Sequence, residues 1–413
     1  MLFSDRPHSL PCSTRLAVGQ VLRKAPNVQP DRLRRRRTPV QGAVLAALLS
    51  IALTACASDA PQDGFLKPEG RYPRMINRVA YPTFIIAGLM LAFVYALVIY
   101  CVVKFRRKHD DDIPVQVHGH TTGEILWTAG PALLLAVIGV FSVNTIFQVA
   151  RTPKNAYDIT VVGHQWWWEY QYPKSGETKL NPKQSVVDDP NRPGKKIGGV
   201  LQEDAAYVST ANELHIPAGQ PVRLAITSMD VMHNYWVPKL SGKIYAIPGR
   251  INYLNLEADT DLVKDGTSAT LYGQCAEFCG TSHANMRFKV VVDTPAEFQK
   301  WLARQEAAAA TPTSELAKAG EEIFKGSGAC STCHYLQSDK GYDPTVDAGK
   351  IGPNLTHVGS RQHFAGAIAP MDDVNLRAWL KNPQAFKPGA KMVIRTLSDD
   401  EITKLVAYIR SLK

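Results

Sequence analysis

The sequence predicts a multidomain chain: a two-helix transmembrane hairpin, then an all-β sandwich or barrel, then a smaller all-α domain. Three observations predict this order. Two long uncharged apolar stretches lie before residue 150, short alternating runs separated by turn residues fill the middle, and helical spacing returns at the end. A length of 413 residues gives room for two or three domains.

The transmembrane hairpin is predicted within residues 57–154, with helices at about 79–103 and 125–149. Each stretch has roughly 25 residues, enough to cross a bilayer with some tilt. Two buried core helices are the alternative, but it is weak at this length and apolarity. The connecting loop begins with the basic run 104–108, which predicts a cytoplasmic loop, although basic residues also flank the other end. We expect both ends of the hairpin on the outer side.

Residues 1–56 are predicted to be an N-terminal extension that ends in an export signal. Arginines precede the apolar run 44–53, and small residues lead to Cys56. This order resembles the lipobox of bacterial lipoproteins, which implies cleavage before Cys56 and its acylation. An ordinary cleavage site that contains a cysteine is the alternative. The arginines supply much of the formal net charge of +10, so we do not interpret that charge as nucleic-acid binding.

Residues 155–298 are predicted to form the all-β domain. Alternating runs at 157–162 and 251–256 are separated by turn residues, and the run 286–292 closes the region. Several short strands with turn signals favour a sandwich or barrel. The polar stretch 173–207, rich in Pro, Gly and Lys, is interpreted as a surface excursion with some β content.

A cluster of soft metal ligands lies near the end of the all-β region. Cys275, Cys279, His283 and Met286 fall within twelve residues, and His233 offers a second imidazole. Thiolate and thioether select copper, and imidazole suits it. Two thiolates that bridge two coppers share one electron with little change in geometry, so transfer is fast. A disulfide in an exported protein and a zinc site are the alternatives; the histidines and methionine argue against the first, and the methionine and export against the second.

A second redox motif follows at Cys330-Ser-Thr-Cys333-His334, the attachment pattern of a c-type haem. The two cysteines would form thioethers to the haem, and His334 would be the proximal iron ligand. The segment 382–392, with its Pro-Gly pair, resembles the distal-methionine loop of class I cytochrome c, which implies Met392 as the sixth ligand, with Met371 as its competitor. Histidine with methionine fills both axial positions, which favours electron transfer over oxygen binding.

The C-terminal region divides into a linker, 299–314, and a helical haem domain, 315–413. The linker contains an Ala/Thr/Pro-rich stretch. Helices are predicted at 316–324, at 373–382 and after Ser398, an N-cap followed by acidic residues. We expect the last helix to cross the first near Phe324 and Tyr408.

The segment Gly273-Gln-Cys-Ala-Glu-Phe-Cys-Gly-Thr-Ser-His-Ala-Asn-Met286 resembles the CuA loop of cytochrome c oxidase subunit II. Further resemblances to that family lie at 124–128, 163–172, 230–233 and 246–252, so that they cover about residues 79–298. Residues 315–413 resemble a class I cytochrome c. The chain is therefore similar to subunit II of a caa-type oxidase, in which a cytochrome c domain is fused to the C-terminus.

This resemblance implies a cupredoxin-like domain that carries a binuclear copper centre, CuA. The implied ligands are His233, Cys275, Cys279, His283, Met286 and the backbone carbonyl of Glu277.

The resemblance also implies roles for individual residues. The Glu277 side chain would bind magnesium at the interface with subunit I. Trp166 would be the residue through which electrons reach CuA, although a core aromatic is nearly as plausible. Glu124 would lie at the mouth of a proton-uptake channel, with an acid favoured by the helix dipole as the alternative. The Pro353 carbonyl would receive the ring N–H of His334. At Trp167 the family usually has tyrosine.

The implied function is electron input to a terminal respiratory oxidase. Electrons would pass from a cytochrome c or a quinol–cytochrome c reductase through haem c and CuA to haem a of subunit I, where oxygen is reduced and protons are pumped. Subunits I and III and membrane lipid would be the partners, in a bacterial inner membrane with the redox domains outside. A quinol oxidase subunit lacks the thiols, and the propeller of nitrous oxide reductase has no room here. A membrane-tethered copper and haem carrier outside any oxidase is the remaining alternative.

Overall fold

The computed structural model describes residues 64–107, 109, 113, 115–116, 118–180, 182–188, 196–202, 207–336 and 351–413. The predicted export signal and Cys56 lie outside these residues. Within the described part of the chain, the order of elements is a helical hairpin, a pair of β-sheets and a helical domain, as the sequence predicts.

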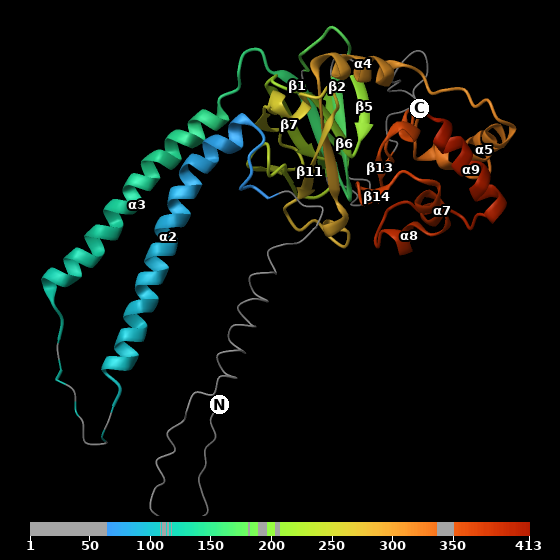
Figure 1. Ribbon diagram of the computed structural model, residues 1–413. Coiled ribbons are helices and arrows are strands. Elements are labelled where there is room, and N and C mark those ends of the chain that lie inside the picture. The colour runs from blue at the N-terminus through green and yellow to red at the C-terminus, as the bar shows by residue number, and fades with distance from the viewer. Residues whose placement is uncertain are drawn as a thin grey trace, which may run out of the picture. The chain divides into compact units, whose positions relative to one another are not determined.

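Two long helices, α2 (Arg71–Lys104) and α3 (Thr121–Ala150), form the hairpin (Figure 1). They contain both predicted spans and extend several residues beyond them. Their apolar windows have mean hydropathies of 2.6 and 2.1, and none of the residues in these windows is buried within the protein. Helices with apolar side chains all around need an apolar environment. By length and composition, both helices can therefore cross a membrane.

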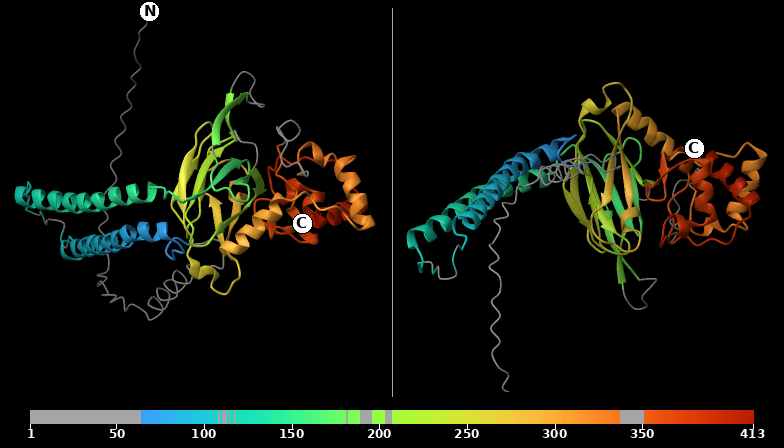
Figure 2. Two further views of the ribbon diagram at one scale, coloured as in Figure 1. Left: turned by 90° about the horizontal axis from the view of Figure 1, so that it is seen from above. Right: turned by 60° about the horizontal axis from the view of Figure 1, so that its bottom comes forward.

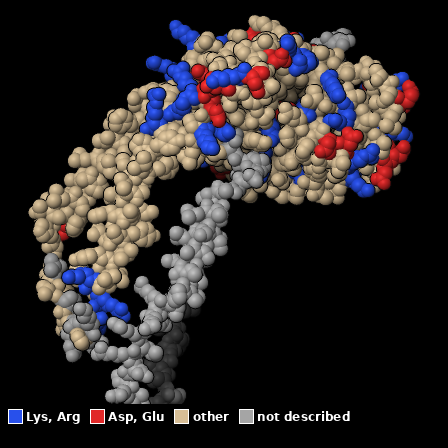
Figure 3. Space-filling model, in the orientation of Figure 1, with Lys and Arg blue, Asp and Glu red and all other residues tan. Residues whose placement is uncertain are grey.

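The charge distribution along the hairpin agrees with this interpretation. Figure 3 shows an almost uncharged surface along both helices, with Lys and Arg side chains gathered near the connecting loop and again near the β domain. The loop end carries Lys104, Arg106 and Arg107, and the other end carries Arg71, Arg74 and Arg78. Basic residues thus lie at both ends of an apolar band, and this band is the part of the hairpin that suits the interior of a bilayer.

The β domain consists of two five-stranded sheets that face each other (Figure 2). One sheet has the order β10-β7-β1-β2-β5, and its strands are β1 (Tyr157–His164), β2 (Trp167–Pro173), β5 (Tyr207–Ala211), β7 (Val222–Ser228) and β10 (Asn252–Leu256). The other has the order β6-β12-β11-β8-β9, and its strands are β6 (Glu213–Pro217), β8 (His233–Trp236), β9 (Lys243–Ala246), β11 (Ala269–Cys275) and β12 (Arg287–Asp293). The predicted sandwich is confirmed.

Strand pairing in the sandwich is mixed. β1 pairs with β7 and β6 with β12 in parallel, whereas the other pairs within the two sheets are antiparallel. The core between the sheets contains many aromatic residues, and Trp168 lies fully buried at its centre against Tyr235 and Phe288. The polar excursion of the sequence contains a separate hairpin, β3 (Pro182–Asp188) and β4 (Lys196–Gln202).

Helix α4 (Pro295–Glu306) follows β12 and packs on the sandwich. Thr294 caps it by accepting a hydrogen bond from the Glu297 amide (3.3 Å), and Pro295 occupies the first turn. The helix buries Phe298, Trp301 and Leu302 in the sandwich core. It covers 299–306, the first part of the segment expected to be a linker, so the stretch without helix or strand is 307–314.

The C-terminal domain is helical, with α5 (Glu315–Lys325), α7 (Asp373–Lys381), α8 (Pro383–Phe386), α9 (Asp399–Ser411) and a two-residue pair of strands, β13 (His363–Phe364) and β14 (Ala369–Pro370). Ser398 and Glu401 form a reciprocal capping box at the start of α9. The expected crossing of the first and last helices is confirmed, because the rings of Phe324 and Tyr408 meet edge to face with centroids 5.4 Å apart.

The crossing of α5 and α9 depends on Gly320. A Cβ at this position would lie 2.1 Å from the backbone oxygen of Lys404 and 2.8 Å from the Cβ of Tyr408. Gly320→Ala should therefore force the helices apart and destabilise the helical domain by about 1–3 kcal/mol. Thermal unfolding followed by the haem absorbance measures this loss. Lys318→Ala, on the exposed side of the same helix, is the control; equal melting temperatures for the two variants would contradict the prediction.

Candidate metal centres

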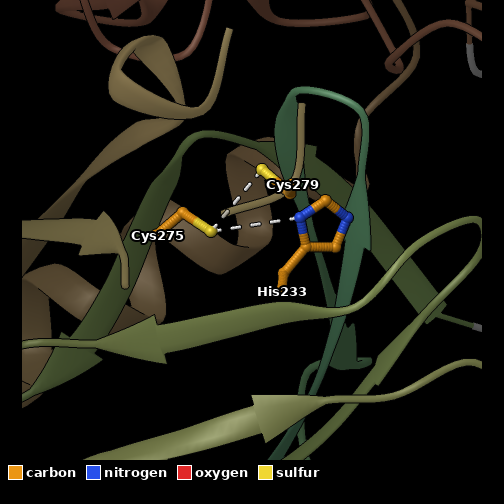
Figure 4. Close-up of side chains that lie close together, drawn as sticks. All are labelled: His233, Cys275 and Cys279. Carbon is orange, nitrogen blue, oxygen red and sulfur yellow. Dashed lines mark hydrogen bonds between the residues drawn. The ribbon is translucent and has the colours of Figure 1, made fainter. Parts of the chain in front are cut away.

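Strand β8 and the loop after β11 bring three predicted copper ligands together, His233, Cys275 and Cys279 (Figure 4). His233 begins β8 and Cys275 ends β11, and the two strands are neighbours in one sheet. The two sulfurs are 3.8 Å apart, and the Cys275 sulfur is 4.0 Å from Nδ1 of His233. All three side chains are buried, with exposed fractions of 5% or less. The donors therefore form a compact site from which water is largely excluded.

The other three predicted donors lie at the same site. The short 3₁₀ helix His283–Asn285 turns the chain so that Nδ1 of His283 is 3.6 Å from the Cys279 sulfur. The thioether sulfur of Met286 is 3.8 Å from the same atom, and the carbonyl oxygen of Glu277 is 3.2 Å from the Cys275 sulfur. The structure thus brings together all six donors that the sequence resemblance implies.

The donor set fits copper better than the alternatives. A disulfide has sulfurs about 2.05 Å apart, whereas Cys275 and Cys279 are 3.8 Å apart and both are free. Metal–thiolate bonds of about 2.3 Å, the value for zinc, let both sulfurs bind one metal at this separation. A fully buried thioether belongs to soft-metal sites rather than to structural zinc sites. The residues present therefore suit copper.

Asp230 orients the His233 ring. Its carboxylate lies 3.1 Å from Nε2 of His233 and accepts hydrogen bonds from the amides of Gln165 (2.7 Å) and Val231 (2.8 Å). Burial alone would raise the pKa of Asp230, but its hydrogen bonds to His233 and these amides lower it well below the usual range. The carboxylate is thus charged and holds the proton of His233 on Nε2. Nδ1, which faces the sulfurs, is left as the ligand atom.

The two thiols also have altered acidities. Hydrogen bonding with the Cys279 thiol lowers the pKa of Cys275 to about 3. The pKa of Cys279 is raised for the same reason, since the pair shares one proton. A thiolate is the metal-binding form of cysteine. The hydrogen bond between the two thiols thus favours the binding form of Cys275 over that of Cys279.

The structure separates the three adjacent tryptophans. Trp168 belongs to the sandwich core, and Trp167 stacks on His164 with ring centroids 4.1 Å apart. Trp166 is 8% exposed, and its indole N–H donates to the carbonyl of Cys279 at 3.0 Å. Among the three, Trp166 is the one bonded to the backbone of a predicted copper ligand. Its position is compatible with both interpretations of this residue, core packing and electron transfer.

Glu124 lies at the start of α3 and takes part in its cap. The imidazole of His120 accepts from the amide of Gly123 (3.0 Å), while the Glu124 carboxylate accepts from the amide of His120 (3.4 Å). A carboxylate at this position also complements the positive end of the helix dipole. The structure gives Glu124 a local helix-capping contact and leaves its side chain exposed.

The haem motif folds as a tight turn after α5. Cys330 begins a 3₁₀ helix, Cys330–Thr332, and both Cys330 and Cys333 are free thiols. The ring Nδ1 of His334 is 2.9 Å from the Pro353 carbonyl, as expected. This bond places the proton on Nδ1, which makes Nε2 the nitrogen with a lone pair for iron. Two free thiols followed by an imidazole in this tautomer fit a covalent haem c.

The two candidate methionines differ in their surroundings. Met371 is a buried member of the helical core, whereas Met392 is partly buried and packs against the rim of that core. A haem ligand needs one side of its thioether left uncovered by protein, so that the iron can bind there. The position of Met392 suits that role, and the position of Met371 suits packing.

Two residues of these sites were not given a role from the sequence. Asp230 lies three residues before His233, and a carboxylate this close to a histidine ligand is a recognisable signal for a group that hydrogen-bonds and orients the ring. Lys387 lies between the haem motif and Met392, and its amine donates to the carbonyl of Trp166. Lys387 and Trp166 are 221 positions apart, so no local sequence pattern indicates their contact.

The fold and the two sites together define a membrane-anchored redox protein with a soft-ligand metal site and a c-type haem motif. Family profiles agree. The periplasmic domain of cytochrome c oxidase subunit II matches residues 157–294, its transmembrane domain matches 74–145, and cytochrome c matches 317–413. The predicted division into hairpin, cupredoxin-like β domain and cytochrome c domain corresponds to these three matches.

Whole-length relatives place the chain more closely. Cytochrome c oxidase subunit 2 of Alkalihalophilus pseudofirmus is 32% identical over 375 residues, which are 89% of this chain and 95% of that protein. The subunit of the same name from Bacillus subtilis is 30% identical over 383 residues, 90% and 97% of the two chains. The chain belongs to the cytochrome c oxidase subunit 2 family, as the sequence motifs indicate.

Among solved structures, the periplasmic domain of subunit II of cytochrome oxidase from Bradyrhizobium japonicum is 29% identical. The match covers 38% of this chain and 97% of that one, with a TM-score of 0.27.

Proposed function

We propose that this chain is the electron-input subunit of a bacterial terminal oxidase. Electrons from a cytochrome c or a quinol–cytochrome c reductase pass through its own haem c and CuA to haem a of subunit I, where oxygen is reduced to water with proton pumping. The observation that carries this proposal is the convergence of six donors, two thiols and a thioether among them, in a chain that also has a haem attachment motif.

His233, Cys275, Cys279, His283, Met286 and the carbonyl of Glu277 would hold the copper. Copper held there would supply a one-electron redox site. The protein keeps the donors in place through the sheet and through the bond from His233 to Asp230. Because His233, Cys275, Cys279 and Met286 are buried, solvent has little to rearrange around them when the charge at the site changes.

Cys330 and Cys333 would attach the haem, and His334 and Met392 would be its axial ligands. Haem c supplies a one-electron carrier with both axial positions filled. The Pro353 carbonyl holds the His334 ring by its Nδ1–H. The short tether between α4 and α5 raises the effective concentration of this donor near the copper loop.

Three residues are proposed to act outside these ligand sets. The side chain of Glu277 would bind magnesium at the interface with subunit I. Trp166 would pass electrons to the copper loop through its hydrogen bond to Cys279. Glu124 would lie at the mouth of a proton-uptake channel, in addition to its contact with the helix start.

The proposed location is the bacterial inner membrane, with the redox domains on the outer face. The two apolar helices would contact lipid and subunit I, and subunit III would complete the complex. The charged ends of the hairpin and its apolar middle support an anchored orientation. Acylation of Cys56 would add a lipid anchor at the mature N-terminus.

Purification of the tagged chain from its native membrane tests the proposal. The chain should carry with it a haem a protein that reduces oxygen when reduced cytochrome c is added, and deletion of the chain should abolish this activity. Recovery of the chain alone, with oxidase activity intact in the deletion strain, would contradict the proposal. That result would favour a tethered copper and haem carrier.

Asp230→Asn tests the support of the copper site. The amide keeps the shape of the side chain but loses the charge that holds the His233 proton on Nε2, so copper affinity should fall about 10–100-fold. Competition with a chelator, followed by metal analysis, measures the affinity. Asp265→Asn, at an exposed turn of the same domain, is the control. Equal copper retention in the two variants would remove the role given to Asp230.

A further inference from the structure

Lys387 is a buried lysine at the contact between the helical domain and the β domain. It follows α8, five residues before Met392, and is 4% exposed. Its amine donates hydrogen bonds to the carbonyl of Trp166 (2.6 Å) and to that of Ala365 (2.9 Å). One bond thus crosses from the helical domain to the β domain, and the other stays within the helical domain.

The two carbonyls compensate for an unfavourable burial. Lysine is almost never fully buried unless it is paired, because its charge loses water. Burial lowers the pKa of Lys387 to about 7, although the Cys279 sulfur opposes this shift. A neutral amine has two N–H groups and an ammonium has three, so both forms can donate to the two carbonyls. The contact with Trp166 is therefore available to both protonation states.

The same loop also touches the Trp166 ring. Gly389 has a positive φ of 82°, and a Cβ there would lie 3.1 Å from the Trp166 ring and 3.0 Å from Thr281. The hydroxyl of Ser282 donates to the carbonyl of Pro388 at 2.5 Å. The loop that carries Met392 is thus packed against both the backbone and the ring of Trp166, with no space for a side chain at Gly389.

Trp166 connects this loop to the copper site on its other side. Its indole N–H donates to the carbonyl of Cys279, and the sulfur of Cys279 lies among the copper donors. From Lys387 through Trp166 to Cys279, the path consists of hydrogen bonds and covalent bonds. Electron transfer slows steeply as the gap between two centres widens, so this contact bears directly on its rate.

Other contacts join the two domains away from the loop. The buried carboxylate of Glu213 accepts from the amides of Gln362 and His363, both at 2.8 Å, and the amide group of Asn354 donates to the carbonyl of Ser209 at 3.0 Å. These bonds do not involve Lys387. Its loss should therefore loosen the loop on Trp166 without separating the domains.

We propose that Lys387 is a positioning residue that holds the Met392 loop on Trp166 and so sets the rate of electron transfer from haem c to CuA within the chain. This inference rests on the proposed function, because it presupposes that both centres are loaded and exchange electrons. Lys387 itself touches neither centre and acts through the backbone of Trp166.

The test is flash reduction of haem c by a photoreductant in the assembled oxidase, followed by the absorbance of haem c and CuA. Lys387→Met keeps the length and removes the donors. Loss of this hydrogen bond should reduce the fraction of time that the Met392 loop is seated on Trp166, and so lower the transfer rate, by about tenfold. The haem and copper spectra should stay unchanged, and so should the rate at which an external cytochrome reduces the haem.

Lys381→Met is the matched control, because its side chain is 70% exposed and pairs with Asp399 inside the helical domain. It should transfer electrons at the wild-type rate. If Lys387→Met does not load haem, Lys387→Gln retains a shorter donor and should still be slower than the control. A wild-type rate in the variant that loads both centres would overturn the role of Lys387. Absence of transfer in the wild-type protein would instead refute the proposed function.

Discussion

Cys275→Ser is expected to abolish the near-infrared band of CuA and its mixed-valence paramagnetic signal while the haem spectrum persists. The Cys275 sulfur has the central position in the site, close to Nδ1 of His233, the sulfur of Cys279 and the carbonyl of Glu277. Serine offers a hard hydroxyl in place of a soft thiolate, so the site loses its preference for copper. Optical and electron paramagnetic resonance spectra of the purified complex measure both centres at once.

The control for this substitution is Cys101→Ser, which replaces an exposed free thiol in α2. It should leave copper, haem and activity unchanged. An unaltered copper band in Cys275→Ser would remove the copper assignment. The close approach of the Cys275 and Cys279 sulfurs would then need another explanation. The proposed electron path would lack a carrier between haem c and haem a.

Met392→Ala is expected to convert haem c from a six-coordinate low-spin form to a high-spin or water-ligated form. Loss of the thioether leaves one axial position open, and the potential of the haem should fall because methionine ligation raises it. The optical spectrum of the oxidised protein and a redox titration measure these changes. Reduction of the haem by its electron donor becomes less favourable as the potential falls, so electron input to CuA should slow while the copper spectrum remains.

Met371→Ala separates ligation from packing. Met371 lies in the helical core, so its truncation should destabilise the helical domain by about 2–5 kcal/mol and leave the haem low-spin. If Met371→Ala gives the high-spin spectrum and Met392→Ala does not, the two assignments must be exchanged.

Much of the copper site could be predicted from the sequence because its donors are close together. Cys275, Cys279, His283 and Met286 lie in one loop, and local spacing alone places them near one another. His233 is 42 residues before Cys275, and strand β8, which His233 begins, pairs with β11. That pairing could be inferred only from the resemblance to a family, since alternation within a strand does not name its partner.

The membrane helices were predictable for a different reason. Apolarity over two dozen residues is a property of the segment itself and needs no partner. The ends were less predictable, because α2 continues through the polar residues 71–78, where Arg74 bonds to Asp259 of the β domain. Tertiary contacts, rather than hydropathy, decide where that helix begins.

The contact between the two redox domains was outside the reach of the sequence. Lys387 donates to the backbone carbonyl of residue 166, and every residue type has this group, so no side-chain pattern identifies the acceptor. Helix α4 was missed for a related reason. The spacing of its apolar residues is visible in the sequence. The Ala-rich stretch after it favours a linker, however, and the expected linker therefore begins at residue 299, inside the helix.

Helix α4 shortens the flexible connection between the β domain and the haem domain. Since α4 is buried against the sandwich, only residues 307–314 are left to connect it to α5. Fully extended, eight residues reach roughly 28 Å. The haem domain therefore stays close to the copper loop, and electron transfer between them should follow first-order kinetics that dilution of the protein cannot change.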